Sequence, residues 1–296
     1  MAWPEAGSAV GWRGPITADA ARSRRYRPEV PPYSFELICE VEPATRPDLT
    51  SVRHQVGVMA PVAGTFLVPD NHLGRATVSS IAAAHEVIAM GRAAIACINS
   101  RDRNRLGFRR DLLTAGAYGV ERLLCVYGDT PESGARARDL NVETMLEEVR
   151  SFGSESAFDG TTFQVGVTSR LAPLPRWKAS ADFVFVQATF DLQELVAWRD
   201  RVAFDGPVYA GVLVLASAAM AKTVVGSTDQ IRVPTALAER LEDDRDAGVD
   251  AACDLVDEIR DSGRFDGVHL IPVGRYRQVA ARLEAAGYRA GRLRRR

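Results

Sequence analysis

The sequence of 296 residues has few cysteines, no long apolar run and almost no net charge. Its four cysteines form no CxxC pair, so we expect buried, reduced thiols in a cytoplasmic protein. The longest weakly polar stretch, residues 208–221, is shorter than the about 18 to 20 residues that cross a bilayer, and the first residues are not typical of a signal peptide. A formal net charge of -1 provides no overall field for nucleic acid or acidic membranes. We expect neither as a partner.

Common motifs of catalytic and binding sites are absent as well. The sequence contains no P-loop, GxGxxG, GxSxG or HExxH motif, and the acidic run at residues 243–246 lacks the ligand order of an EF-hand. We therefore expect no metal site. No fingerprint identifies residues that would bind a dinucleotide.

The composition divides the chain into a central domain and two polar ends. Residues 1–32 mix proline, glycine, alanine and arginine without a hydrophobic period, which predicts a flexible N-terminal arm. Residues 289–296 form a basic C-terminal tail that we interpret as a solvated terminus. Residues 33–288 form the remaining domain, and 46% hydrophobic residues in the chain are enough for a large core.

Eight short apolar runs follow one another along this domain, and most are continuous rather than alternating, which is typical of parallel strands covered on both faces. The runs lie at residues 34–42, 65–69, 93–99, 122–127, 163–168, 183–189, 208–215 and 267–273. Amphipathic segments, such as 75–91 and 192–202, separate most of them. This alternation predicts an α/β fold, a single-domain (β/α)8 TIM barrel.

The spacing of the runs is irregular in two places. The fifth and sixth runs are too close for a full crossover helix, which predicts a shortened fifth βα unit with a loop or short helix at 171–178. The seventh and eighth runs are far apart, which predicts an extra helix, with helices around 234–242 and 247–262.

Polar side chains at the carboxyl ends of the predicted strands are candidates for a site, because barrels of this type place their active sites there. Glu40 and Glu42 close the first run, Asp129 follows a glycine turn after the fourth, and Gln187 interrupts the sixth. An acid in an apolar run is costly to bury without a partner or a task. Other interpretations stay open: a salt bridge inside the barrel for Glu40, a cap or turn for Asp129, and a backbone bridge for Gln187.

Five short motifs support one family resemblance. In chain order they are Glu40 with Pro43, Gly128-Asp129-x-Pro131, Gln187-x-x-Phe190-Asp191, Gly211-Val212-Leu213 and Gly267-Val268-His269. Together they resemble the methylenetetrahydrofolate reductase family over about residues 35–285. The resemblance implies a (β/α)8 barrel that reduces 5,10-methylenetetrahydrofolate to 5-methyltetrahydrofolate, usually through FAD reduced by a nicotinamide. It implies Glu40 as the general acid, with Asp129, Gln187 and Phe190 binding the folate.

The sequence departs from the family mainly at positions that lie against the flavin in that family, which we call the flavin side. The family's turn after strand two is replaced by Val-Pro-Asp-Asn-His at 68–72, and the histidine of strand three is missing at 94–97. Leu-Arg-Gly-Asp has become Val-Tyr-Gly-Asp at 126–129, and the segment Tyr-Pro-Glu-x-His is replaced by 170–178. The ring-stacking positions after strand seven are Met220 and Val224. We therefore expect no bound FAD and a direct hydride transfer from NADH, with NADPH as an alternative.

The sequence leaves three alternatives to this oxidoreductase of one-carbon metabolism and methionine biosynthesis. They are a non-catalytic folate-binding barrel or partner subunit of a reductase, a conventional FAD-dependent reductase, and an unrelated barrel enzyme. A folate-binding barrel has no use for an acid at position 40, so Glu40 favours the enzyme. The expected partners are a folate and a nicotinamide, and the oligomeric state stays open.

Overall fold

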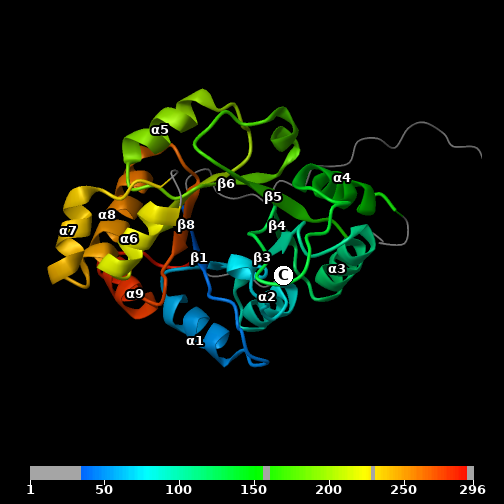
Figure 1. The fold of residues 1–296 in the computed structure, drawn as a ribbon, viewed down its shortest axis with the longest axis horizontal. Helices are drawn as coiled ribbons and strands as arrows, with labels where there is room; N and C mark the ends of the chain where they lie inside the picture. The colour runs from blue at the N-terminus through cyan, green and yellow to red at the C-terminus, as the bar shows by residue number, and fades with distance from the viewer. Residues whose placement is uncertain (1–34, 156–160, 228–230, 292–296) are drawn as a thin grey trace, which may run out of the picture. The chain divides into compact units, whose positions relative to one another are not determined.

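The computed structural model describes residues 35–155, 161–227 and 231–291 (Figure 1). The predicted N-terminal arm, residues 1–32, and residues 292–296 of the predicted basic tail lie outside them. Eight parallel strands form a closed barrel, in which each strand pairs with its neighbours in the chain and β8 pairs with β1. The predicted (β/α)8 barrel is thus confirmed.

Each strand overlaps one of the eight apolar runs of the sequence. They are β1 (Glu36–Glu40), β2 (Thr65–Val68), β3 (Ala93–Asn99), β4 (Arg122–Val126), β5 (Gln164–Ser169), β6 (Phe183–Val186), β7 (Val208–Leu213) and β8 (Gly267–Ile271). The helices of the described residues are α1 (Thr50–Met59), α2 (Ser80–Ala89), α3 (Arg105–Ala117), α4 (Val142–Phe152), α5 (Leu192–Arg201), α6 (Ala218–Ser227), α7 (Thr235–Asp243), α8 (Ala247–Ser262) and α9 (Tyr276–Ala285). Two short 3₁₀ helices, η1 (His72–Gly74) and η3 (Arg176–Ser180), lie in loops.

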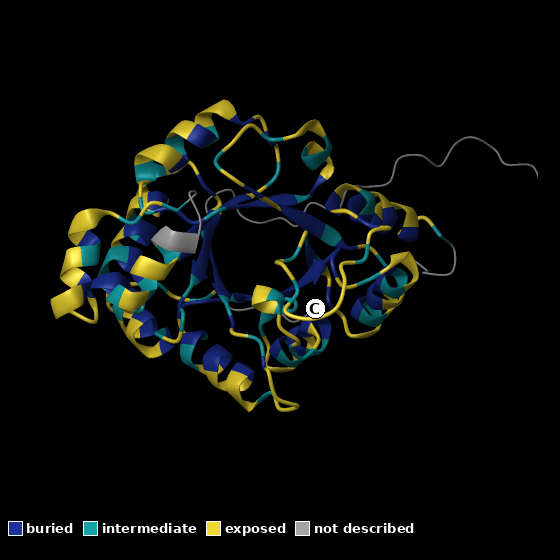
Figure 2. Cartoon of the chain, in the orientation of Figure 1, coloured by how far each residue is buried: buried dark blue, intermediate teal, exposed yellow. Residues whose placement is uncertain are grey.

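Apolar side chains pack on both faces of the strands, as their continuous apolar sequences require. Figure 2 shows the strands almost uniformly buried, inside a ring of helices that expose their outer faces. One large cluster lies between strands and helices, whereas a smaller cluster, which includes Ile38, Leu67, Ile95 and Phe185, fills the lumen. Burial on two faces therefore selects the barrel.

The irregular spacings correspond to real departures from a regular barrel. Only η3 connects β5 to β6, which confirms the shortened fifth unit. Three helices, α6, α7 and α8, lie between β7 and β8, where the sequence predicted two. Helix α6 was missed because its small apolar residues form no stripe that the hydrophobic period could detect.

A polar cluster closes the amino-terminal end of the lumen. Arg122 pairs with Glu36 at 2.9 Å, and the Tyr209 hydroxyl donates to the same carboxylate at 2.6 Å. Thr65 donates to Glu36 at 2.6 Å. Burial would raise the pKa of Glu36, but the charge of Arg122 and these hydrogen bonds outweigh it and lower the pKa. The cluster keeps Glu36 ionised inside the barrel.

Two further expectations concern the thiols and the membrane. All four cysteines are buried and form no disulfide, as predicted. No helix in the described part of the chain is long and apolar enough to span a bilayer.

Candidate functional site

Glu40 ends β1 at the carboxyl-terminal mouth of the barrel. Its side chain is 15% exposed, and its Oε2 lies 3.0 Å from Nε2 of His269, on the neighbouring strand β8. The two groups lie at ion-pair distance, but Nε2 of His269 makes no hydrogen bond among the described residues. A buried polar atom without an aligned partner is unusual, so the pair retains unused hydrogen-bonding capacity at the mouth of the lumen.

Aromatic and apolar side chains form the floor below Glu40. The ring of His269 stacks on Phe185, with centroids 5.0 Å apart, and Phe185 makes an edge contact with Tyr209 at 5.2 Å. Cys97 belongs to the same lumen cluster. Burial, together with the charge of Glu40, raises the pKa of this thiol well above its ordinary value, so it stays protonated and is no nucleophile. Glu40 is thus the ionisable group of this region that remains partly exposed.

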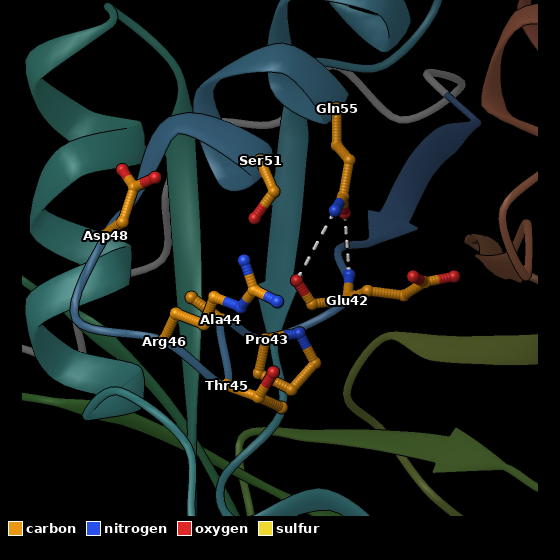
Figure 3. A pocket seen from close by; sticks show the side chains of 8 residues that line it. All are labelled: Glu42, Pro43, Ala44, Thr45, Arg46, Asp48, Ser51 and Gln55. Carbon is orange, nitrogen blue, oxygen red and sulfur yellow. Dashed lines mark hydrogen bonds between the residues drawn. The ribbon is translucent and has the colours of Figure 1, made fainter.

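Two side chains fix the backbone that holds Glu40. The Tyr276 hydroxyl donates to the carbonyl of Glu40 at 3.3 Å and accepts from the N–H of Glu42 at 3.0 Å. Gln55 accepts from the same N–H at 2.7 Å (Figure 3). Glu42 itself is exposed and lines a cavity of about 290 Å³ that also borders Pro43. The two acids therefore differ in surroundings: Glu40 lies at the lumen and Glu42 outside the strand.

Asp129 lies in the loop after β4 and is tied to the loop after β2. Its Oδ2 accepts from the N–H of Leu73 at 3.0 Å, and the side chain is exposed. The turn before it requires glycine, because Gly128 has φ +76° and an added Cβ would lie 3.0 Å from the Cβ of Asn99. At Gly74, likewise with positive φ, a Cβ would lie 2.0 Å from the carbonyl oxygen of Thr130. The two loops are thus in direct contact.

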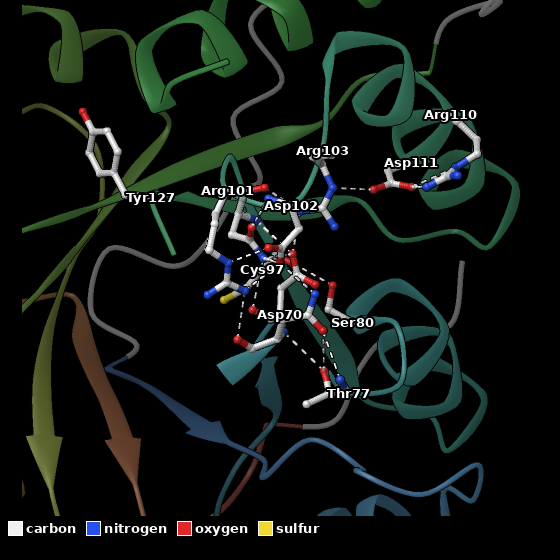
Figure 4. A network of polar contacts seen from close by, with 12 residues as sticks. Asp70, Thr77, Ser80, Cys97, Arg101, Asp102, Arg103, Arg110, Asp111 and Tyr127 are labelled. Carbon is white, nitrogen blue, oxygen red and sulfur yellow. Dashed lines mark hydrogen bonds and ion pairs between the residues drawn. The ribbon is translucent and has the colours of Figure 1, made fainter. Parts of the chain in front are cut away.

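A buried arginine joins the loops after β2, β3 and β4 (Figure 4). Arg101 is 1% exposed, and its guanidinium donates to the carboxylate of Asp102, to the carbonyl of Asp129 at 2.7 Å and to that of Asn71 at 3.2 Å. Hydrogen bonds from Arg101 hold the pKa of Asp102 well below its ordinary value. The charge of Arg101 is therefore compensated and hydrogen-bonded, as a buried cation requires.

A second arginine continues this network under the loops. Arg103 pairs with Asp70 at 2.7 Å and with Asp111 at 2.8 Å. Asn99, at the end of β3, donates to Asp70 at 2.6 Å and to Asp102 at 2.9 Å. The polar groups at the carboxyl ends of β2 and β3 are therefore bonded mainly to one another. Tyr127, in contrast, projects away from the network and is 52% exposed.

Backbone strain flanks the strand that carries Glu40. In the described part of the chain, three non-glycine residues have positive φ: Asn71 at 47°, Leu73 at 53° and Val273 at 46°. The first two follow β2 and the third follows β8, and these strands are the neighbours of β1. Such conformations cost about 1 to 3 kcal/mol each and cluster at functional sites. Their positions agree with a site centred on Glu40.

The other predicted residues lie on the far side of the mouth. Gln187, directly after β6, borders a cavity of about 480 Å³ that also contacts Arg170, Arg201 and Glu194. Phe190 is partly buried and packs against the apolar cluster that contains Leu215.

Among the described residues, no hydrogen bond or ion pair joins any two of Glu40, Asp129 and Gln187. They surround the mouth from the ends of three strands, and their joint contact with one ligand stays a prediction. Sequence analysis missed the contacts of His269, Tyr276 and Arg101, although His269 lies in a motif that supported the family resemblance.

Comparisons with known proteins bear on the family and on the fold. The family model described as methylenetetrahydrofolate reductase matches residues 174–287, which confirms the resemblance over that part of the chain. No curated protein matches the sequence.

Solved structures share the barrel at low identity. A Clostridium thermocellum protein that binds two copies of 5-methyl-5,6,7,8-tetrahydrofolic acid aligns with a TM-score of 0.57 and 10% identity, over 86% of this chain and 95% of that chain. The spore cortex-lytic enzyme SleL of Bacillus cereus aligns with a TM-score of 0.52 and 13% identity, over 88% of this chain and 76% of that chain. At such identities the likeness establishes the fold alone.

Proposed function

We propose that the protein reduces 5,10-methylenetetrahydrofolate to 5-methyltetrahydrofolate with NADH or NADPH and without a bound flavin. The observation that carries the proposal is an acid, Glu40, held at the mouth of the barrel beside a histidine with an unsatisfied ring nitrogen. The family match over residues 174–287 supports the substrate class. The Clostridium thermocellum neighbour, which binds 5-methyltetrahydrofolic acid, supports it further.

Glu40 supplies the proton in the chemistry that we propose. Its protonated carboxyl donates to N10 of the folate, the bond from N10 to the bridging carbon breaks, and a 5-iminium cation forms. A hydride from C4 of the reduced nicotinamide then adds to that carbon, which gives the 5-methyl group and the oxidised nicotinamide. The carboxylate of Glu40 regains its proton from solvent at the mouth. His269 positions the carboxyl, and Asp129 supplies negative charge for the cation.

The residues at the family's flavin side do not fit a flavin. The resemblance places the flavin against the turn after strand two and against strand three. Here the side chain of Arg101 joins the loops after β2, β3 and β4 and is only 1% exposed. Its donors are bonded to Asp102, Asn71 and Asp129. The loop after β2 also contacts the loop after β4 directly, at Gly74 and Thr130. We therefore propose no step through FAD.

We predict that the purified protein is colourless and that added FAD does not raise its activity. The physical reason is the network of Arg101, which would have to open, leaving a buried charge unpaired, before an isoalloxazine could enter. The measurement is the visible absorbance of the native protein and of the supernatant after denaturation. Release of stoichiometric yellow flavin would contradict the prediction.

Asp129 and Gln187 are expected to bind the pterin. Loss of one hydrogen bond to a charged group costs about 1.5 to 3 kcal/mol, so Asp129→Ala should weaken folate binding by about ten- to a hundredfold, and Gln187→Ala by less. Asp129→Asn is the matched control, because an amide oxygen still accepts from Leu73 and holds the loop. Calorimetric titration with the folate measures the effect. Unchanged affinity in both alanine variants would exclude the assignment.

The function is tested by mixing the protein with NADH and methylenetetrahydrofolate. The expected result is oxidation of NADH with equimolar formation of 5-methyltetrahydrofolate. If the folate binds but NADH is not consumed, the protein is a folate-binding barrel or a partner subunit. If neither binds, the barrel serves an unrelated reaction, because a fold does not determine a function.

A further inference from the structure

The cavity beside Gln187 has an excess of positive charge. Arg170, Arg201 and Arg232 line it, against one carboxylate, Glu194. That carboxylate already accepts a hydrogen bond from Thr189 at 3.1 Å. None of the three arginine side chains has an ion-pair or hydrogen-bond partner within residues 35–155, 161–227 and 231–291. In the loops after β2 and β3, by contrast, arginines are paired with aspartates.

These cations come from separate segments that meet beside the loops after β5 and β6. Arg170 directly follows β5, Gln187 follows β6, Arg201 ends α5, and Arg232 precedes α7. The loop after β5 is held in place, because the indole N–H of Trp198 donates to the carbonyl of Ala172 at 2.8 Å. The part of the cavity at Arg170 and Gln187 therefore belongs to the face where barrel enzymes bind substrates, and from there the cavity extends along α5 to Arg201.

A further cation lies nearby. Lys178, in η3, donates to the carbonyl of Thr168 at 2.6 Å. Burial and the neighbouring charge of Arg170 lower the pKa of Lys178. A cluster in which cations repel one another is stabilised when an anion binds, and arginines suit carboxylates and phosphates because their donors match two oxygens at once.

We propose that this arginine cavity binds the anionic end of a substrate whose reacting part lies at Glu40. The inference rests on the proposed function for the identity of that substrate. Two sources have the required chemistry: the carboxylates of a γ-linked glutamate tail on the folate, and the pyrophosphate of the nicotinamide dinucleotide. Gln187, which borders the cavity and is a predicted pterin contact, connects the two regions.

Titration of the complete protein with two separate probes tests the cavity without reference to activity. The probes are a tetra-γ-glutamate peptide and ADP-ribose, each titrated at low salt into the wild type, Arg170→Ala/Arg201→Ala and Arg277→Ala. Arg277 is an exposed arginine on α9 and controls for the loss of surface charge. We expect one probe to bind the wild type and the Arg277→Ala variant alike, and to bind the double variant at least tenfold more weakly.

Each outcome decides the inference. Weaker binding of the peptide identifies the folate tail as the ligand, and weaker binding of ADP-ribose identifies the dinucleotide. Equal binding of both probes by the wild type and the double variant, or no binding of either probe, overturns the proposal.

Steady-state kinetics separate this result from the proposed function. In the double variant, KM for the substrate with the anionic end should rise at least tenfold, while kcat stays within a factor of about two. If the wild type consumes no NADH with monoglutamyl methylenetetrahydrofolate, the proposed function fails, but the probe titrations still report on the cavity.

Discussion

The turnover of a Glu40→Gln variant is expected to fall by about 10² to 10⁴, which is the usual contribution of a general acid. Glutamine keeps the shape of the side chain at the end of β1 but has no acidic proton to donate to N10. Folate affinity should change much less, because the proton is needed mainly in the transition state. Single-turnover oxidation of NADH, together with folate titration, measures both quantities.

Glu42→Gln is the matched control for this experiment. The two acids are two residues apart, but Glu42 is exposed and lies beyond the strand, whereas Glu40 contacts His269 at 3.0 Å. We expect near-normal turnover in Glu42→Gln. Should Glu42→Gln be inactive and Glu40→Gln active, the role of general acid passes to Glu42. If both are active, the proposed reductase chemistry is wrong.

The strands were predictable because their signal is local. Continuous runs of Val, Ile, Leu and Phe occur only where both faces are buried, and residues 93–99 were predicted with the bounds that β3 has. The run at 34–42 was predicted too long at its carboxyl end. Beyond Glu40 the backbone N–H of Glu42 is bonded to the side chains of Gln55 and Tyr276 rather than to a strand. No local pattern encodes such a contact.

The site was predictable only in part, for the same reason. Glu40, Asp129 and Gln187 could be found because each is a polar residue at the end of an apolar run. Arg101 could not, because Arg-Asp-Arg at 101–103 has the composition of a solvated loop. Its burial depends on acceptors from two other loops, Asn71 and Asp129, which are distant in sequence. The cations of the arginine cavity are likewise brought together only by the fold.

Replacing Arg122 with methionine should destabilise the barrel by about 3 kcal/mol at neutral pH. This is the lower end of the range for breaking a buried ion pair, because Glu36 keeps 31% of its side chain exposed. Methionine fills the stem of the arginine, which packs with its guanidinium 5.0 Å from the centroid of Phe183, but leaves Glu36 without its cation. Urea unfolding followed by circular dichroism measures the change. Arg277→Met, at an exposed position on α9, should be nearly neutral.

The pH dependence of stability should change sign in the same variant. In the wild type, Arg122 and hydrogen bonds keep the pKa of Glu36 below its ordinary value of 4.5. The ionised Glu36 therefore stabilises the fold above that value, and this stability is lost as the pH falls through the lowered pKa. Without Arg122, only the hydrogen bonds from Thr65 and Tyr209 oppose burial, which is the largest single influence. We therefore expect the pKa of Glu36 to rise above its ordinary value, so that the variant becomes more stable as the pH falls from neutral toward 5. The double variant Glu36→Gln/Arg122→Met should lose this dependence and recover part of the stability, because no buried charge then lacks a partner. A single variant that loses stability on acidification in parallel with the wild type would show that Arg122 is not what keeps Glu36 ionised.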